Sequence, residues 1–151
     1  MNGSDFIAAV EADLKPFIEA DKGSVFMAAD PFHALEILAA SPASYFVVLL
    51  DKGEGVETQG PVQWLVPKVG LFVAQQKGFS ANPGAHILPL SIRCEAVRDR
   101  VMSLEHDAAE TDVHPAYLGK GLVTLPDGMP LAAYELNFSL RVSGPSLTYR
   151  S

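Results

Sequence analysis

Histidine and carboxylate side chains gather in one short stretch of this sequence, between Glu105 and His114. Within it His106, Glu110 and His114 recur at every fourth position, a spacing that places them on one face of a helix. Imidazole and carboxylate groups are common ligands of divalent metals. The stretch has no His-Glu-x-x-His motif, and Pro115 follows its last histidine. Two hypotheses therefore stay open: the metal site of a small metal-dependent enzyme, and a solvated acidic loop.

The sequence contains one candidate thiol nucleophile and no serine elbow. Cys94 is the only cysteine, and its spacing from Leu90 and Val97 places it on the apolar stripe of a helix. A free cysteine in that position behaves as a small hydrophobic residue. No Gly-x-Ser-x-Gly motif is present. We therefore expect Cys94 to lie in the core. We also expect that the protein is not an enzyme and has no catalytic residues and no cofactor.

The glycine-rich stretch from Asp51 to Gly60 has some features of a phosphate-binding loop. Its glycines miss the dinucleotide spacing, no Lys-Ser or Lys-Thr pair closes it, and a strand is predicted after it where a helix is required. Its two glutamates, Glu54 and Glu57, would repel an anion. The stretch is therefore predicted to be a flexible loop that joins two strands.

Three segments have the apolar spacing of helices: residues 4–20, 31–40 and 88–104. In the first, Pro16 predicts a kink or a boundary near Lys15, because proline removes a helical N–H and crowds the preceding turn. Asp30 followed by Pro31 is typical of the start of the second helix. The third segment has the most regular pattern, with apolar residues three or four positions apart.

Four segments are predicted to be strands that form two hairpins: residues 45–50, 62–75, 122–125 and 134–142. Apolar residues alternate with polar ones in the last, so one side of that strand is buried and the other meets water or another subunit. Hairpins with helices packed against them predict an α+β domain. We expect an antiparallel or mixed β-sheet of about four strands.

Length and composition indicate a single domain. The chain has 151 residues, of which 48% are apolar, and no linker or repeat divides it. We expect residues 1–151 to form one domain in which residues 144–151 are a loosely held tail. One cysteine excludes a disulfide scaffold. No apolar run reaches the ~20 residues of a membrane helix, and no basic start of a signal peptide is present, so we expect a soluble protein in the cytoplasm.

Negative charge is concentrated in the first part of the chain. The net charge is −7, and residues 1–60 hold three lysines against ten carboxylates. This balance argues against binding nucleic acid through its phosphates. The asymmetry predicts an acidic face formed by the N-terminal helices and the first loop. One hypothesis from this charge alone is an acidic cytosolic binding module for a basic partner.

The order of the predicted elements resembles the tail terminator (tail completion) proteins of long-tailed bacteriophages. The resemblance rests on a helix, a short apolar strand, a longer strand, an amphipathic helix and an alternating last strand, here residues 4–20, 45–50, 62–75, 88–104 and 131–142. It covers most of the chain. Neck and head-to-tail connector proteins are the alternative within the same class.

This resemblance implies a structural virion protein, assembled in the host cytoplasm and located in the tail or neck. Its subunits would form a ring, commonly hexameric, that caps the tail tube and contacts the tail tube protein and head-tail connector proteins. No cofactor, membrane or nucleic-acid readout is implied. A ring needs two different contact patches on each subunit. The candidate interface residues come from the first loop and the last strand: Glu54, Glu57, Gln59, Glu135, Asn137, Ser139 and Arg141. Trp64 is predicted to be a core residue or, alternatively, an interface anchor.

Overall fold

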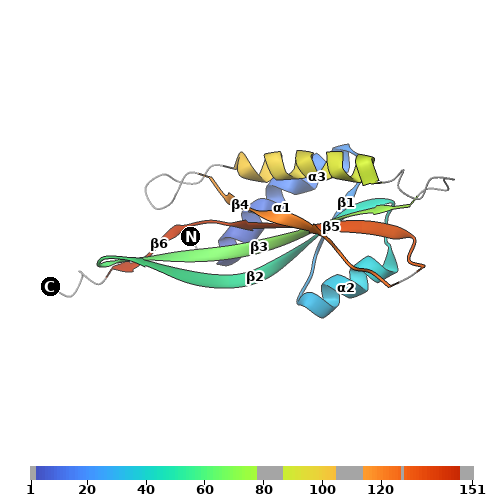
Figure 1. Ribbon diagram of the computed structural model, residues 1–151. Coiled ribbons are helices and arrows are strands. Elements are labelled where there is room, and N and C mark those ends of the chain that lie inside the picture. Colours follow the sequence, from blue (N-terminus) through green and yellow to red (C-terminus); the bar gives the residue numbers. More distant parts are fainter. Residues whose placement is uncertain (1–2, 78–86, 105–113, 127, 147–151) are drawn as a thin grey trace.

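The computed structural model describes residues 3–77, 87–104, 114–126 and 128–146. Within these residues the chain forms three helices and a six-stranded sheet (Figure 1). The helices are α1 (Gly3–Ala20), α2 (Pro31–Ala40) and α3 (Ile87–Met102). The strands are β1 (Ser24–Met27), β2 (Tyr45–Gln59), β3 (Val62–Gln76), β4 (Ala116–Leu122), β5 (Leu131–Ser139) and β6 (Val142–Ser146). None of the described helices is long and apolar enough to cross a membrane.

The sheet is mixed, which confirms the predicted α+β class. Its order is β1-β2-β3-β5-β4, with β6 pairing β3, and β1 is parallel to β2 while the other pairs are antiparallel. The predicted number of about four strands is wrong, since the described sheet has six. The two additional strands, β1 and β6, have four and five residues. Strands this short carry little periodicity, so their pairing with distant segments decides that they form.

Helices cover both faces of the sheet. α1 and α3 pack on one face and α2 packs on the other (Figure 1). Alternate residues of β2 enter the two cores: Val47 and Leu49 lie beneath α1 and α3, and Phe46 and Val48 lie against the α2 side. The continuous apolar run of this strand is therefore buried on both faces, as its sequence predicts.

α1 continues through Pro16 to Ala20, so a helix boundary near Lys15, one of the two predicted alternatives, is wrong. Pro16 is exposed, whereas the stripe of Val10, Leu14 and Ile18 is completely buried. A proline inside a helix costs about 3 kcal/mol, and burying one such side chain contributes ~1.5–3 kcal/mol. Packing of the stripe on the sheet thus outweighs the local cost.

α2 begins and ends where the sequence predicts. The Asp30 carboxylate accepts a hydrogen bond from the His33 backbone N–H at 2.8 Å, and Pro31 occupies the first turn. Ser41 ends the helix in the left-handed conformation at φ 46°. The helix buries Leu38 but leaves Phe32 79% exposed, because only one face of the helix packs on the sheet.

Both strands of the last hairpin are shifted from their predicted bounds: β5 ends at Ser139, and Val142, predicted to lie in the same strand, begins β6 and pairs with β3. The predicted alternation is confirmed within β5. In β5, Leu136 and Phe138 are buried, while Glu135 and Asn137 lie on the opposite face. β4 ends at Leu122, where the sequence pattern begins the strand. Gly119 and Gly121 weaken the strand signal in the segment that does pair. Residues 144–146, expected in a loosely held tail, are the end of β6, and residues 147–151 lie outside the described residues.

Candidate assembly interface

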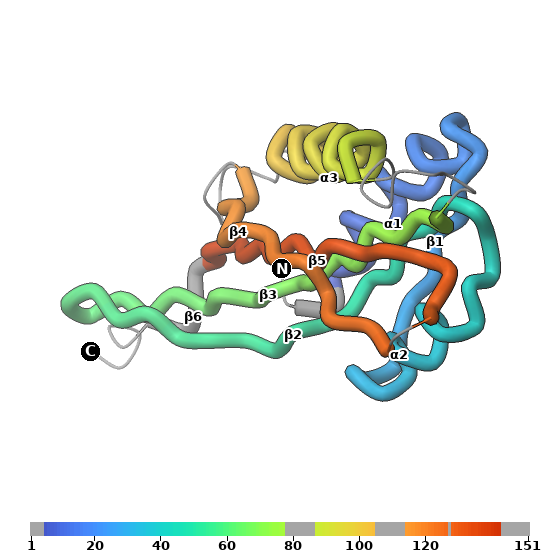
Figure 2. The backbone as a smooth tube through the Cα atoms, turned by 45° about the vertical axis from the view of Figure 1, so that its right-hand side comes forward, coloured from blue at the N-terminus to red at the C-terminus, as the bar shows by residue number. Residues whose placement is uncertain are grey.

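The β2–β3 hairpin extends past the helices as a projection, here called the arm (residues 51–67), and β6 pairs with β3 along it. Its pairing runs from Glu54 opposite Pro67 to Gln59 opposite Val62. Figures 1 and 2 show the arm projecting from one end of the molecule. Since β1 accompanies β2 only from Phe46 to Leu49, no described strand lies beside the outer edge of β2 along the arm. The predicted flexible loop at residues 51–60 is therefore mostly strand.

Two glycines set the shape of the arm. A bulge separates Asp51 from Glu54, and Gly53 sits there at φ 91° with its N–H donating to Asp51 Oδ1 at 2.8 Å. Gly60 turns the chain at φ 60°. Because the arm leaves the body, most of its β2 side chains are exposed. An exposed strand shows no alternation of buried and polar residues, which explains why its sequence is typical of a loop.

Three side chains meet on one face of the arm: Glu57, Trp64 and Arg141. The Arg141 guanidinium lies 4.8 Å from the centroid of the Trp64 ring, and its Nη1 is 3.6 Å from Glu57 Oε2. Trp64 lies directly opposite Glu57 in the ladder. Together with Thr58 and Gln59 they line a hollow of about 330 Å³. Trp and Arg on a rigid surface are the residue types that most often dominate binding energy at interfaces.

Trp64 is partly buried. It is therefore neither a fully buried core residue nor a fully exposed interface anchor, the two alternatives predicted for it. Its Nε1 atom is buried and has no hydrogen-bond acceptor among the described residues. Leaving such a donor unpaired costs roughly 1–3 kcal/mol.

A second polar group lies on the open face of the sheet. Lys52 Nζ donates to Glu135 Oε1 at 3.0 Å. The side chain of Lys52 crosses Gly70, where an added Cβ would lie 3.2 Å from Lys52 Cδ and 3.3 Å from Asn137 Oδ1. Gly70 thus leaves space for the lysine to reach β5. Glu135 and Asn137 line a further hollow beside Gly121.

The predicted interface residues thus separate into two groups. Glu54, Glu57 and Gln59 are exposed on the arm, and Arg141 joins them through its ion pair with Glu57. Glu135 and Asn137 are half-buried on the sheet. Ser139 differs from the others: it is only 8% exposed, because it lies in the ladder between Lys68 and Ala116.

The metal hypothesis involves residues that are for the most part not described. His106 and Glu110 lie outside the described residues. His114 is described, and its Nδ1 lies 2.9 Å from the backbone oxygen of Leu104. The described part of the chain holds no group of three or more His, Cys, Asp or Glu residues placed to bind a metal ion.

Cys94 lies in the core between α3 and the sheet, as predicted. Burial raises the pKa of its thiol from 9.0 to about 11. A reactive cysteine requires a lowered pKa and access to solvent. The environment of Cys94 therefore favours the protonated, unreactive thiol.

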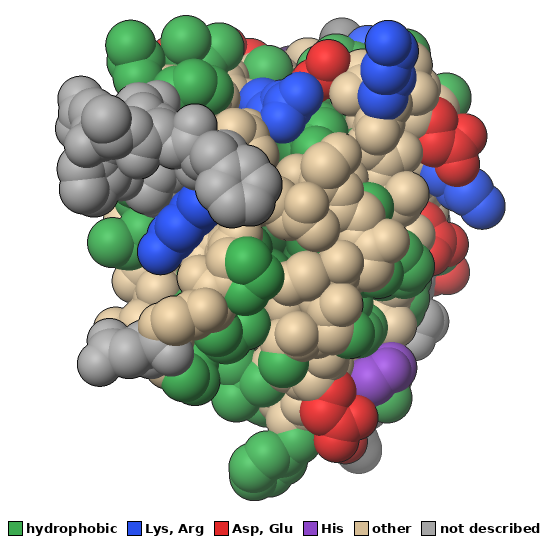
Figure 3. Space-filling view, turned by 90° about the vertical axis from the view of Figure 1, so that its right-hand side faces the viewer, with side chains coloured by type: hydrophobic (Ala, Val, Ile, Leu, Met, Phe, Trp, Pro, Cys, Tyr) green, Lys and Arg blue, Asp and Glu red, His purple; other side chains and the backbone are tan. Residues whose placement is uncertain are grey.

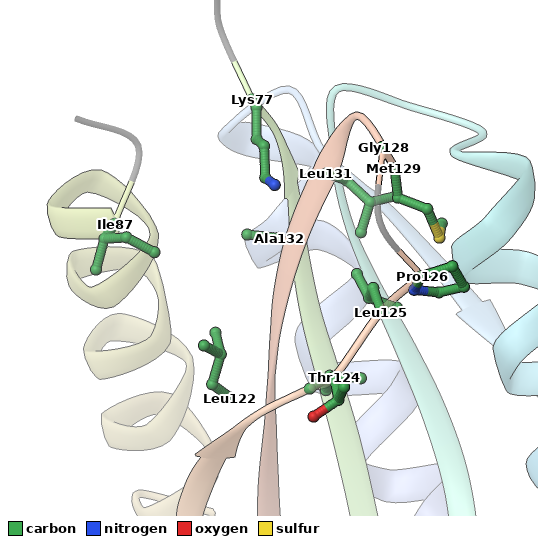
Figure 4. A pocket seen from close by; sticks show the side chains of 11 residues that line it. Lys77, Ile87, Leu122, Thr124, Leu125, Pro126, Gly128, Met129, Leu131 and Ala132 are labelled. Carbon is green, nitrogen blue, oxygen red and sulfur yellow. The ribbon is translucent and has the colours of Figure 1, made fainter. Parts of the chain in front are cut away.

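A groove that no functional motif of the sequence predicted lies at the other end of the sheet. The groove has a volume of about 350 Å³ and lies between the start of α3, the end of β4 and the segment that leads into β5 (Figure 4). Its lining is apolar except for Lys77 and Thr124: Ile87, Leu122, Val123, Leu125, Pro126, Gly128, Met129, Leu131 and Ala132. Viewed from the end opposite the arm, charged side chains lie mainly around the margin of the molecule (Figure 3). The one sequence signal for the groove was the apolar run Leu122 to Leu125.

No family model matches this sequence, and no curated protein matches it. Among solved structures, a chain described as "Virion of native gene transfer agent (GTA) particle" is similar, with a TM-score of 0.50 and 18% sequence identity. The alignment covers 80% of this chain and 78% of that chain. The two chains share a fold. At this identity the likeness concerns the arrangement of helices and strands over most of both chains. A shared fold does not by itself determine a function.

Proposed function

We propose that this chain is a structural virion protein of a phage-like particle, and that it acts by docking on other subunits. The observation that carries the proposal is the shared fold with a chain of a gene transfer agent virion over 80% of the present chain. The elements that carry the resemblance to tail terminator proteins are among those that the structure contains, from α1 through the β2–β3 hairpin and α3 to β5.

Surface features support an assembly role. The arm projects from the body, its outer β2 edge has free backbone groups among the described residues, and such edges readily pair with another chain. On one arm face Trp64 and Arg141 are stacked beside an unpaired indole N–H. Aromatic and arginine side chains on a projecting hairpin are suited to contact with another protein.

In its finer form the proposal is a tail terminator: a hexameric ring that caps the tail tube, stops its growth and joins it to the head. The partners would be further copies of this chain, the tail tube protein and the head-tail connector proteins, and the location would be the tail or neck of the virion. A neck or connector subunit is the alternative within the same class. Either role is non-catalytic and requires no cofactor.

The oligomeric state tests this proposal directly. We expect the purified protein to form closed rings, detected as a species several times the mass of one chain by light scattering and as annular particles by electron microscopy. Antibodies against the chain should label one end of the tail in intact particles. A protein that stays monomeric at all concentrations and is absent from particles would contradict the proposal.

A further inference from the structure

The arm and the groove lie at opposite ends of the same strand. β3 begins at the tip of the arm with Val62, and its end at Gln76 leads directly into Lys77 of the groove. At ~3.3 Å per residue, a strand of 15 residues separates these ends by roughly 45 Å. The arm of one chain therefore cannot reach its own groove. Any contact between the two surfaces joins separate copies.

One face of the arm presents a carboxylate next to an apolar side chain. Glu54 and Val56 are two positions apart on β2, so they point to the same side of the hairpin, roughly 7 Å apart. Val56 is 59% exposed, and Glu54 is exposed with no ion pair to another described residue. Glu57 points to the opposite side, toward Trp64 and Arg141. The face with Glu54 and Val56 is thus available for contact.

The groove presents the complementary arrangement. Among the described residues that line the groove, Lys77 is the only charged one. Figure 4 shows the Lys77 side chain extending from the end of β3 toward the apolar lining, with Ile87 and Leu122 on α3 and β4. Leu122 is 59% exposed although it is apolar. A valine placed against this lining would bury apolar surface while a neighbouring glutamate reached the lysine ammonium.

We propose that the arm of one copy docks in the groove of the next, with Val56 against Leu122 and the Glu54 carboxylate paired with Lys77. This inference rests on the proposed assembly role and names the contact that builds it. The contact is heterologous, because each copy contributes two different surfaces. Heterologous contacts produce a ring when the rotation between neighbours closes, and an open filament when it does not.

A charge exchange tests the contact. Glu54→Lys and Lys77→Glu each place like charges opposite one another, and each variant alone is expected to weaken self-association at least about tenfold. In an equimolar mixture every Glu54→Lys arm meets a Lys77→Glu groove, and every unchanged arm meets an unchanged groove. Assembly should therefore return in the mixture, measured by light scattering and sedimentation. The double variant in one chain should also assemble.

Matched controls separate this contact from a general effect of charge or hydrophobicity. Glu36→Lys makes the same charge change on an exposed position of α2 and should leave assembly unchanged. Leu122→Asp should weaken assembly, and Leu118→Asp, its control, should not. Both leucines lie on β4, with 59% and 54% exposure, but only Leu122 lines the groove. Circular dichroism confirms that each variant is folded.

Each outcome decides the inference. Loss of assembly in both charge variants with recovery in their mixture supports it. Wild-type assembly that persists in either variant, or that fails to return in the mixture, overturns the arm-in-groove contact while leaving the proposed function intact. A wild-type protein that never associates overturns both, which distinguishes the failure of the function from the failure of the contact.

Discussion

Gly23 shows how closely single positions are packed in this fold. It follows α1, where its N–H donates to the backbone oxygen of Ile18 at 2.9 Å. A Cβ at this position would lie 2.6 Å from Ile18 Cγ2 and 2.7 Å from Tyr45 Cδ2. Both neighbours are buried, so neither can move aside without disturbing the core. Glycine is required here by lack of space.

We therefore expect Gly23→Ala to lower the free energy of unfolding by about 1–3 kcal/mol, the usual cost of overpacking a core. Chemical denaturation measures this change. Gly121→Ala is the matched control, because a Cβ at Gly121 meets nothing within 4 Å. Equal effects of the two substitutions would show that backbone propensity, and not packing at Gly23, sets the cost.

Burial of Cys94 makes the free energy of unfolding depend on pH in the alkaline range. Its buried thiol has a pKa of about 11, above the ordinary 9.0 of an exposed thiol. As the pH rises from 9, the unfolded chain loses this proton before the folded chain does. The free energy of unfolding contributed by Cys94 is therefore complete below about pH 9 and is lost toward about pH 11.

In a Cys94→Ala variant we expect the fall of the free energy of unfolding with pH to be shallower in this range, by up to ~1.4 kcal/mol per pH unit. Urea denaturation over a series of alkaline buffers measures the slope. Burial also raises the pKa of Tyr45, but this group titrates in both proteins, so the comparison isolates the thiol. Parallel slopes would contradict the assigned burial effect.

At the scale of single elements, the stability of α2 depends on Asp30, the residue immediately before the helix. Asp30 accepts the N–H of His33, and the ring Nδ1 of His33 in turn accepts the N–H of Ala29 at 2.9 Å. The first bond satisfies a backbone donor that the first turn of the helix leaves without a partner, and the second joins that turn to the residue before the cap. We expect Asp30→Ala to reduce the free energy of unfolding by about 1 kcal/mol, measured by thermal or urea denaturation, and Asp30→Ser to restore most of it. A loss of the same size with serine would exclude the capping bond as the cause.

Outside its own hairpin, the tip of the arm pairs with β6 and contacts Arg141. None of residues 57–64 belongs to either hydrophobic cluster of the described chain. Replacing these residues by Asn-Gly would join Val56 to its ladder partner Leu65 through a two-residue hairpin turn. We expect a melting temperature within a few degrees of the wild-type value, measured by circular dichroism. Global unfolding on this replacement would show that the arm is required for the fold itself.

At the scale of the whole molecule, the uneven charge of the sequence is partly neutralised by tertiary pairing. Arg100 of α3 binds Asp13 of α1 through two hydrogen bonds of 2.9 Å. Arg93, also on α3, contacts Asp21 at 3.3 Å. The acidic N-terminal face predicted from charge counts is therefore reduced where α1 meets α3. Glu36 on α2 and Glu54 on the arm are exposed, and neither forms an ion pair with another described residue.

Local patterns by themselves determined the class of this fold and several of its elements. The apolar stripes of α1 and α3, the cap of α2, the buried run of β2 and the alternation along β5 each follow from periodicities of a few residues. Cys94 was placed in the core for the same reason. Information of this kind lies within one turn or one strand, so it can be read without knowing what lies across the fold.

Tertiary structure alone decided the features on which function depends. Pro16 stays inside α1 because the opposite side of the helix packs on the sheet, and the polar residues 51–59 form a strand because β3 lies beside them. Trp64 meets Arg141 through a contact between residues far apart in sequence. The groove likewise combines residues of α3, β4 and β5. Such surfaces are created by long-range contacts, whose free energy no local pattern of residues records.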